Sequence, residues 1–179
     1  IGDEKNPLLK AKKIYNYITS HIMYSFMRTY ITLPPIVEYV ATSMKGDCGV
    51  QATLFITMCR IAGIPARWQA GLYATPEIIG SHDWAQFYIA PYGWLYADCS
   101  FGGTAYRHQS TLRREFYFGH LEPFRIPCAS EFQCEFYPPK KYLRRDPYDN
   151  QTGEVEYNDA FIPRNHYEMN LEIIKINEE

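Results

Sequence analysis

Apolar residues recur at helical spacing near the start of the chain. The repeating residues, one at every fourth position, are Ile14, Ile18 and Ile22. This period places them on one face of a helix, and Pro7 suits a first helical turn, so residues 7–26 are predicted to form a helix. The pair Pro34 and Pro35 then breaks the chain, and a loop is expected over residues 36–47.

A second helical pattern follows this loop. Its apolar stripe consists of Val50, Leu54, Phe55, Met58, Ile61 and Ala62. Asp47 is a good N-cap residue, Gly63 stands where a helix commonly ends, and Pro65 prevents continuation. Residues 48–62 are therefore predicted to form the second helix.

Further along, runs of β-branched and aromatic residues predict strands. The predicted strands are residues 66–74, 82–89, 94–99, 131–137 and 167–173. Between the last two, residues 146–159 are polar and rich in turn formers, without a core pattern. Helices that precede an antiparallel sheet indicate an α+β fold.

The composition narrows the class of protein. The chain has 179 residues, of which 46 % are hydrophobic and 21 % charged, with a formal net charge of −2. Such a chain is globular with one sizeable core, so residues 1–179 are predicted to form a single domain. The small net charge argues against nucleic acid as a partner, and no apolar run reaches the ~20 residues of a membrane span. Aromatic residues make up 16 %, which suits either a sheet-rich fold or an aromatic ligand groove.

The chain begins at Ile1 and shows no leader sequence. It is interpreted as a processed form or as part of a longer polypeptide, and an extracytoplasmic location is favoured if a leader was removed. The five cysteines are an odd number without a CxxC pair, which excludes a zinc ribbon and a dense disulfide scaffold. Cys59 is interpreted as core filler, and Cys128 and Cys134 as buried or disulfide-bonded.

Cys48 differs from the other cysteines because it stands at a predicted helix start. Unpaired backbone N–H groups and the positive end of the helix dipole favour a thiolate there, which predicts a lowered pKa and a nucleophile. The same N–H groups could hold an oxyanion, and Gly46 and Gly49 leave room for a substrate backbone. The alternative is a small residue packed at a helix start without a chemical role.

The hairpin after this helix offers a base and an orienting carboxylate. If the hairpin is symmetric about Ala90, His82 faces Asp98 on the neighbouring strand, with Cβ atoms about 4.5–5.5 Å apart. The carboxylate would then fix the imidazole tautomer, as acyl transfer by a cysteine requires. A register slip of two residues would separate the pair. Taken singly, a surface histidine and a turn aspartate are the simpler interpretations.

In chain order these residues form a set of motifs. They are Gly-Asp-Cys-Gly at 46–49, Arg-Ile-Ala-Gly-Ile-Pro-Ala-Arg at 60–67, His-Asp-Trp at 82–84, Gly-Trp at 93–94 and Asp98. The set resembles the catalytic core of the transglutaminase-like superfamily, in its microbial type, over about residues 8–102. The resemblance implies a papain-like fold, in which the cysteine helix packs on an antiparallel sheet. It also implies Cys48 as nucleophile, His82 as base and Asp98 as orienting residue.

Three features depart from the family pattern. Asp83 stands where Ala is common, and this extra carboxylate would either act on the histidine or point to the opposite face of the strand. Cys99 stands where many members have Pro. No tryptophan precedes the cysteine to act as second oxyanion donor, so Tyr24 or Tyr39 is expected to serve instead. Trp84 belongs to the histidine motif and is a candidate for binding substrate or for supporting the hairpin.

The resemblance implies cysteine-dependent acyl transfer through a thioester, without a metal or an organic cofactor. Hydrolysis of a peptide or amide bond in a protein or peptide substrate is the favoured reaction, and transamidation is the other outcome. The alternative from another class is a non-catalytic module that binds protein or glycan on the same fold. Residues 103–179 carry no chemical motif; they are expected to complete the sheet, to wall the cleft and, being rich in aromatics, to set specificity.

Overall fold

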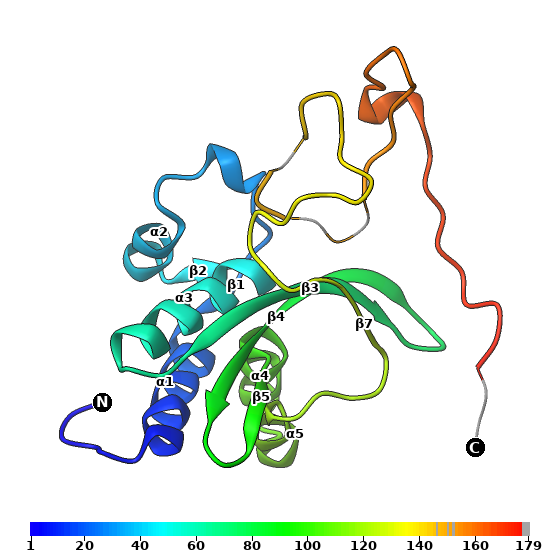
Figure 1. Ribbon diagram of the computed structural model, residues 1–179. Helices are drawn as coiled ribbons and strands as arrows, with labels where there is room; N and C mark the ends of the chain where they lie inside the picture. Colours follow the sequence, from blue (N-terminus) through cyan, green and yellow to red (C-terminus); the bar gives the residue numbers. More distant parts are fainter. Residues whose placement is uncertain (146, 150, 152, 177–179) are drawn as a thin grey trace.

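A five-stranded sheet and the helices around it form the body of the molecule (Figure 1). The computed structural model describes residues 1–145, 147–149, 151 and 153–176. The sheet has the order β6–β5–β4–β3–β7, and all neighbouring strands in it are antiparallel. Its strands are β3 (Ala66–Ala74), β4 (Ile79–Ile89), β5 (Gly93–Ala97), β6 (Phe118–Gly119) and β7 (Arg125–Ala129).

The helices pack on this sheet and on one another. They are α1 (Pro7–His21), α2 (Ile36–Ser43), α3 (Cys48–Ile61), α4 (Cys99–Arg107), α5 (Thr111–Phe116) and the short 3-10 turns η1 (Tyr30–Thr32) and η2 (Arg164–His166). Helix α3 packs on β3 and β4, while α1 and α4 pack on α3. Two short parallel strands, β1 (Met23–Tyr24) and β2 (Lys45–Gly46), meet just before α3. The predicted mixture of helices and antiparallel sheet is confirmed.

The first helix is shorter than predicted. It ends at His21 rather than at residue 26, because Ile22 is extended and Met23 begins the strand that pairs with Lys45. The predicted buried face is confirmed, since the three isoleucines are at most 1 % exposed.

The loop predicted for residues 36–47 is wrong, because it contains helix α2 and strand β2. The helix begins directly after Pro35, a position where the missing N–H group costs no helical hydrogen bond. It ends at Ser43, and the next residue, Met44, takes the left-handed conformation, with φ 55°. Val40 is fully buried in the core that α2 shares with α3. Eight residues with one fully buried position give too short a pattern to recognise.

The second predicted helix is confirmed as α3. Asp47 caps it, since its carboxylate accepts a hydrogen bond from Val50 N at 3.0 Å. Gly63 follows with φ 80°, the left-handed conformation that a helix end favours. Phe55 of α3 lies edge-on to Phe87 of β4, with ring centroids 5.6 Å apart, and both rings are fully buried. This contact fixes the helix on the sheet.

Three of the predicted strands are confirmed as β3, β4 and β5. The second begins earlier than predicted, at Ile79, and the third ends at Ala97, so Cys99 belongs to α4. Helices α4 and α5, which lie between β5 and β6 in the chain, were not predicted. The aspartate that closes the β5 motif acts as the N-cap of α4, which starts the helix there.

Two predicted strands are wrong. Residues 131–137 contain a turn at 132–133 and no strand, and the edge strand β7 lies just before them. The aromatic residues of this segment pack instead of pairing: Phe132 lies edge-on to Trp68, with centroids 5.0 Å apart, and stacks on Tyr148 at 5.5 Å. Residues 167–173 have no strand partner among the described residues, because alternation alone does not supply a neighbouring strand.

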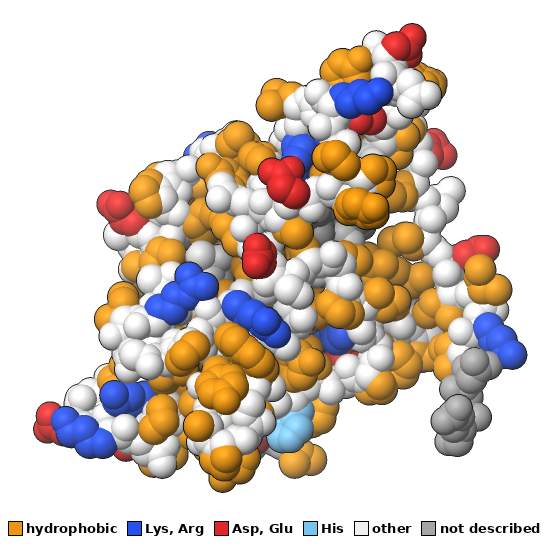
Figure 2. Space-filling view, viewed as in Figure 1, with side chains coloured by type: hydrophobic (Ala, Val, Ile, Leu, Met, Phe, Trp, Pro, Cys, Tyr) orange, Lys and Arg blue, Asp and Glu red, His pale blue; other side chains and the backbone are white. Residues whose placement is uncertain are grey.

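The chain after β7 rises over the sheet and ends far from the N-terminus (Figure 1). The predicted turn-rich segment, residues 146–159, includes residues 146, 150 and 152, which lie outside the described residues. On the face in Figure 2, hydrophobic side chains gather where this part of the chain meets the sheet. No helix in the described part of the chain is long and apolar enough to cross a bilayer.

The hairpin of β4 and β5 pairs in a different register from the predicted one. Symmetry about Ala90 would set residue 86 opposite 94, but Gln86 pairs with Tyr96 and Tyr88 with Trp94. The pairs are therefore centred on Pro91, and the register is shifted by two residues. The physical reason is the three-residue turn over 90–92, which lies between the paired strand ends.

Replacing Phe87 by Ala should destabilise the fold by about 3–5 kcal/mol, because it removes a buried ring that contacts Phe55 and Phe118. The measurement is the free energy of unfolding in urea, followed by circular dichroism. Tyr88→Ala, the next residue along the strand and 40 % exposed, is the control, with an expected loss below about 1 kcal/mol. Equal losses in the two variants would contradict this packing.

Candidate active site

Cys48 is the first residue of α3, and its surroundings leave little space. The residue is 9 % exposed. A Cβ atom at the next position, Gly49, would come within 2.2 Å of the Tyr30 hydroxyl and 2.6 Å of the Asp83 carboxylate. The glycine predicted to make room for a substrate backbone therefore makes room for these two side chains.

The Cys48 thiol is hydrogen-bonded to an aspartate. Its Sγ lies 3.6 Å from Asp83 Oδ2, and Asp83 Oδ1 accepts a hydrogen bond of 2.7 Å from Gln151 Nε2. Successive strand residues point to opposite faces of a sheet, so Asp83 faces α3 while His82 points to the other face. Of the two orientations left open by the sequence, Asp83 takes the one away from the histidine. Among the described residues, no hydrogen bond joins the thiol to the His82 ring.

This environment keeps the thiol protonated. Burial raises the pKa of Cys48 well above its usual range, and the carboxylates of Asp83 and Asp47 raise it further. Burial also raises the pKa of the Asp83 carboxyl. The prediction of a lowered thiol pKa is therefore wrong, because desolvation and two acidic neighbours outweigh the helix dipole. All five cysteines are free thiols, so the disulfide considered for Cys128 and Cys134 is not formed.

His82 and Asp98 meet although the predicted register is wrong. His82 Nε2 lies 2.8 Å from Asp98 Oδ2, and the residues are 6 % and 0 % exposed. The observed register, extended by one residue, sets Trp84 opposite position 98, so the pair is diagonal across the strands, a separation that long side chains span. Because a carboxylate only accepts, Nε2 carries the proton and Nδ1 is the basic nitrogen of the ring.

Asp98 is ionised in its buried position. Burial alone would raise the pKa of its carboxyl, but His82 and the Arg125 guanidinium lower it, and the net pKa lies well below the usual range. Arg125 Nη2 lies 2.8 Å from Oδ2. The other oxygen, Oδ1, accepts from the Ser100 hydroxyl at 3.1 Å and from Phe101 N at 2.9 Å. These donors fix the carboxylate on all sides.

The three further residues named by the sequence lie in different surroundings. Burial raises the pKa of Tyr24, in β1, to about 12, and the charge of Cys48 raises it further, so the Tyr24 hydroxyl stays protonated. Tyr39 lies on α2, and no hydrogen bond of its hydroxyl to a described residue is found. Trp84 is 1 % exposed and donates from Nε1 to Gln69 Oε1 at 2.6 Å, which indicates support of the hairpin rather than contact with substrate.

Three residues of the site escaped the sequence analysis. The Tyr30 hydroxyl donates to the carboxylate that caps α3, at 2.7 Å. Arg125 binds the carboxylate that orients the histidine, and Gln151 binds the carboxylate beside the thiol. Each lies far from its partner in sequence and belongs to no recognisable spacing, so only the folded chain brings it to the site.

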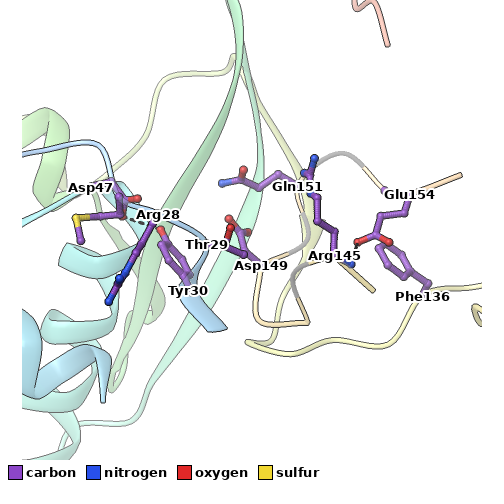
Figure 3. Close-up of a pocket in the computed structure, with 11 residues that line it drawn as sticks. Arg28, Thr29, Tyr30, Asp47, Phe136, Arg145, Asp149, Gln151 and Glu154 are labelled. Atoms are coloured by element: carbon purple, nitrogen blue, oxygen red, sulfur yellow. Dashed lines mark hydrogen bonds between the residues drawn. The ribbon is translucent and has the colours of Figure 1, made fainter. Parts of the chain in front are cut away.

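A cavity of about 340 Å³ opens beside the start of α3 (Figure 3). Asp47 and Tyr30 lie on one side of it, and Asp149 and Gln151, from the chain after β7, lie across from them. Further charged side chains line it: Arg28, Arg145 and Glu154. In the described part of the chain, no group of three or more His, Cys, Asp or Glu side chains could hold a metal ion.

The model of the transglutaminase-like superfamily matches residues 1–99, more than half of the chain. The chain belongs to the transglutaminase-like superfamily. Membership confirms the resemblance seen in the motifs, and it supports a cysteine-dependent enzyme in general terms. The predicted fold class is confirmed too, because the helix that carries Cys48 packs on an antiparallel sheet in this superfamily member.

Solved structures similar to this superfamily member include a "putative cysteine protease" from Cytophaga hutchinsonii. It is 26 % identical, with a TM-score of 0.48, over 55 % of this chain and 33 % of that one. The periplasmic domain of TgpA from Pseudomonas aeruginosa is 19 % identical, with a TM-score of 0.47, over 62 % of this chain and 42 % of that one. The chain thus spans less than half the length of either structure. No curated protein matches it.

Replacing Asp83 by Ala should lower the pKa of the Cys48 thiol. When Asp83 is ionised, its negative charge disfavours a thiolate on the neighbouring Cys48. The Ala substitution removes this negative charge. We expect the midpoint of the pH dependence of Cys48 alkylation by iodoacetamide to fall by at least about one pH unit. Alkylation is followed by peptide mass spectrometry, and the exposed Cys128 serves as internal control. A midpoint that stays or rises would show that Asp83 does not hold the thiol protonated.

Proposed function

We propose that the chain is a cysteine hydrolase that cleaves a peptide or amide bond of a protein or peptide through a thioester on Cys48. In this proposal His82 is the acid and base, and Asp98 orients it. The observation that most supports it is the buried hydrogen bond of 2.8 Å between these two residues. This bond lies one residue along β4 from Asp83, the partner of the thiol.

The proposed reaction has two halves. Cys48 Sγ attacks the carbonyl carbon, and its proton passes to His82 Nδ1. The oxyanion accepts from the Cys48 backbone N–H, which has no intrahelical partner, and from the Tyr24 hydroxyl. The imidazolium gives its proton to the leaving amine as the C–N bond breaks, and a thioester remains. Water then attacks the thioester, His82 takes a proton from it, and the acid product and the thiol are released.

Before attack, the thiol must leave Asp83 and turn toward His82. Because His82 points to the face of β4 away from α3, this approach requires a movement of the start of α3 relative to β4 and not only rotation of the Cys48 side chain. The Gln151 carboxamide occupies the other oxygen of Asp83, so the aspartate keeps one partner when the thiol leaves it.

Water is the proposed acyl acceptor. A cavity beside the helix start is lined by Asp47, the residue before Cys48, but not by Cys48, His82 or Asp98 themselves. Charged and polar side chains line its volume of about 340 Å³, and a polar cavity of this size holds water. Transamidation would need an amine to displace this water near Asp47 and Gln151.

One observation favours the alternative, a non-catalytic binding module. The thiol is buried, bonded to an acid and raised in pKa, as expected for a packed cysteine without chemistry. A hydrolase would change a protein or peptide substrate covalently, and this change would depend on Cys48. A binding module would cause no such change.

Cys48→Ala should abolish that change, with a loss of at least about 1000-fold, because the nucleophile is gone. The substrate is a diverse peptide library with blocked amines, and mass spectrometry records new amino termini and conversion of glutamine to glutamate. His82→Ala should lose at least about 100-fold, because proton transfer is lost.

Cys128→Ser, which removes an exposed thiol, is the matched control and should keep full activity. The same library with a fluorescent alkylamine added reports transamidation. Identical products from the wild type and from Cys48→Ala would refute the proposed function and leave the binding module.

A further inference from the structure

We infer that Arg125 is a positioning residue of this site, which holds the Asp98 carboxylate in place and limits how strongly His82 binds a proton. The inference rests on the proposed function. The superfamily model matches residues 1–99, so Arg125 lies outside the matched part of the chain. It belongs to residues 103–179, in which the sequence analysis found no catalytic motif.

The Arg125 side chain is enclosed. It is 5 % exposed, and its guanidinium lies over three rings, 5.2 Å from the Tyr73 centroid, 5.2 Å from Trp84 and 4.8 Å from Phe101. Such rings attract a cation through their faces and exclude water. A buried cation held in this way is fixed in position, which a surface arginine is not.

The guanidinium and the imidazole bind the same oxygen atom. Arg125 Nη2 and His82 Nε2 each lie 2.8 Å from Asp98 Oδ2. The arginine therefore fixes the direction from which Oδ2 receives the histidine. Its positive charge also opposes the pull of the carboxylate on a proton at the ring, so it favours the neutral imidazole that can accept a proton from the thiol.

The charges of the cluster are balanced for the reaction. Arg125 Nε also donates to Glu122 Oε1, so one cation stands between two carboxylates. With His82 neutral the four groups carry one net negative charge, and with His82 protonated they carry none. Because buried charge is costly unless compensated, the imidazolium that forms during acyl transfer is tolerated there.

A glycine allows β7 to bring the arginine this close. A Cβ atom at position 71 of β3 would lie 2.0 Å from the carbonyl oxygen of Ile126. Gly71 therefore lets β7 approach β3 where it pairs with Pro127, two residues along the strand from the Tyr73–Arg125 pair. The same strand pair thus carries the Tyr73 ring and the cation.

The titratable groups around His82 come from several elements. Asp83 is next to His82 in β4. Besides Arg125, the titratable groups on which the charge of Asp98 acts are Tyr15 of α1, Tyr24 of β1, Cys48 of α3, Cys99 of α4 and Tyr117. None of these others bonds to the His82 ring among the described residues, so Asp98 and Arg125 are the groups whose removal acts on it directly.

The test follows the His82 ring by NMR in carbon-labelled protein, with His82→Gln for assignment. Arg125→Gln keeps a donor for Asp98 but removes the charge, so the pH at which the ring signals change should rise by about one pH unit. Glu122→Gln removes the negative charge behind the guanidinium and should move this midpoint the other way. Arg125→Lys should leave it within about 0.3 pH units, because the charge is kept.

In the peptide assay, Arg125→Gln should lower kcat by at least about tenfold with little change in KM, because orientation and not binding is lost. Arg113→Gln, which changes an exposed arginine, is the control for both measurements.

Equal ring midpoints in all variants, with only lower thermal stability, would overturn the inference. If Arg125→Gln does not fold, the Glu122→Gln and Arg125→Lys shifts decide. Shifted midpoints without Cys48-dependent cleavage in the wild type would refute the proposed function alone.

Discussion

The buried Asp98 carboxylate joins the main parts of the structure. It follows β5, caps α4, orients His82 of β4 and binds Arg125 of β7. A buried carboxylate is costly unless its oxygens accept hydrogen bonds, so each of these contacts depends on the others. The sheet, the helix after it and the C-terminal part of the chain are thereby held in one arrangement by a single anion.

Asp98 and Asp83, the two buried acids of the β4–β5 hairpin, show how the surroundings of a carboxyl group set its pKa. Asp98 is buried but faces a guanidinium and an imidazole, which lower its pKa. Burial raises the pKa of Asp83 and neighbouring acids raise it further, while the hydrogen bonds from Gln151 and Cys48 lower it too little to offset this. Neighbouring charge, not burial, distinguishes them. The same contrast separates the orienting carboxylate from the one that keeps the Cys48 thiol protonated.

Local signals in the sequence were enough for α3, for the central strands and for the residues of the motif. The N-cap, the apolar stripe and the terminating glycine of α3 are features of residues close together in sequence. Asp47 and Gly63 could therefore be identified from the sequence. The His82–Asp98 contact was predicted with the wrong register and still forms, because a long side chain tolerates a diagonal neighbour. Helix α2, strand β7 and the contacts of Gln151 depend on residues that are distant in sequence. No local pattern therefore predicts them.

The C-terminal part of the chain acts on the site from two directions. Its strand β7 supplies the cation beside Asp98, and Gln151 supplies the amide beside Asp83. The first contact stabilises the carboxylate that binds the His82 ring, while the second stabilises the carboxylate that binds the thiol. Both contacts come from one continuous segment, so the carboxylate beside His82 and the carboxylate beside the thiol each depend on the chain that follows α5.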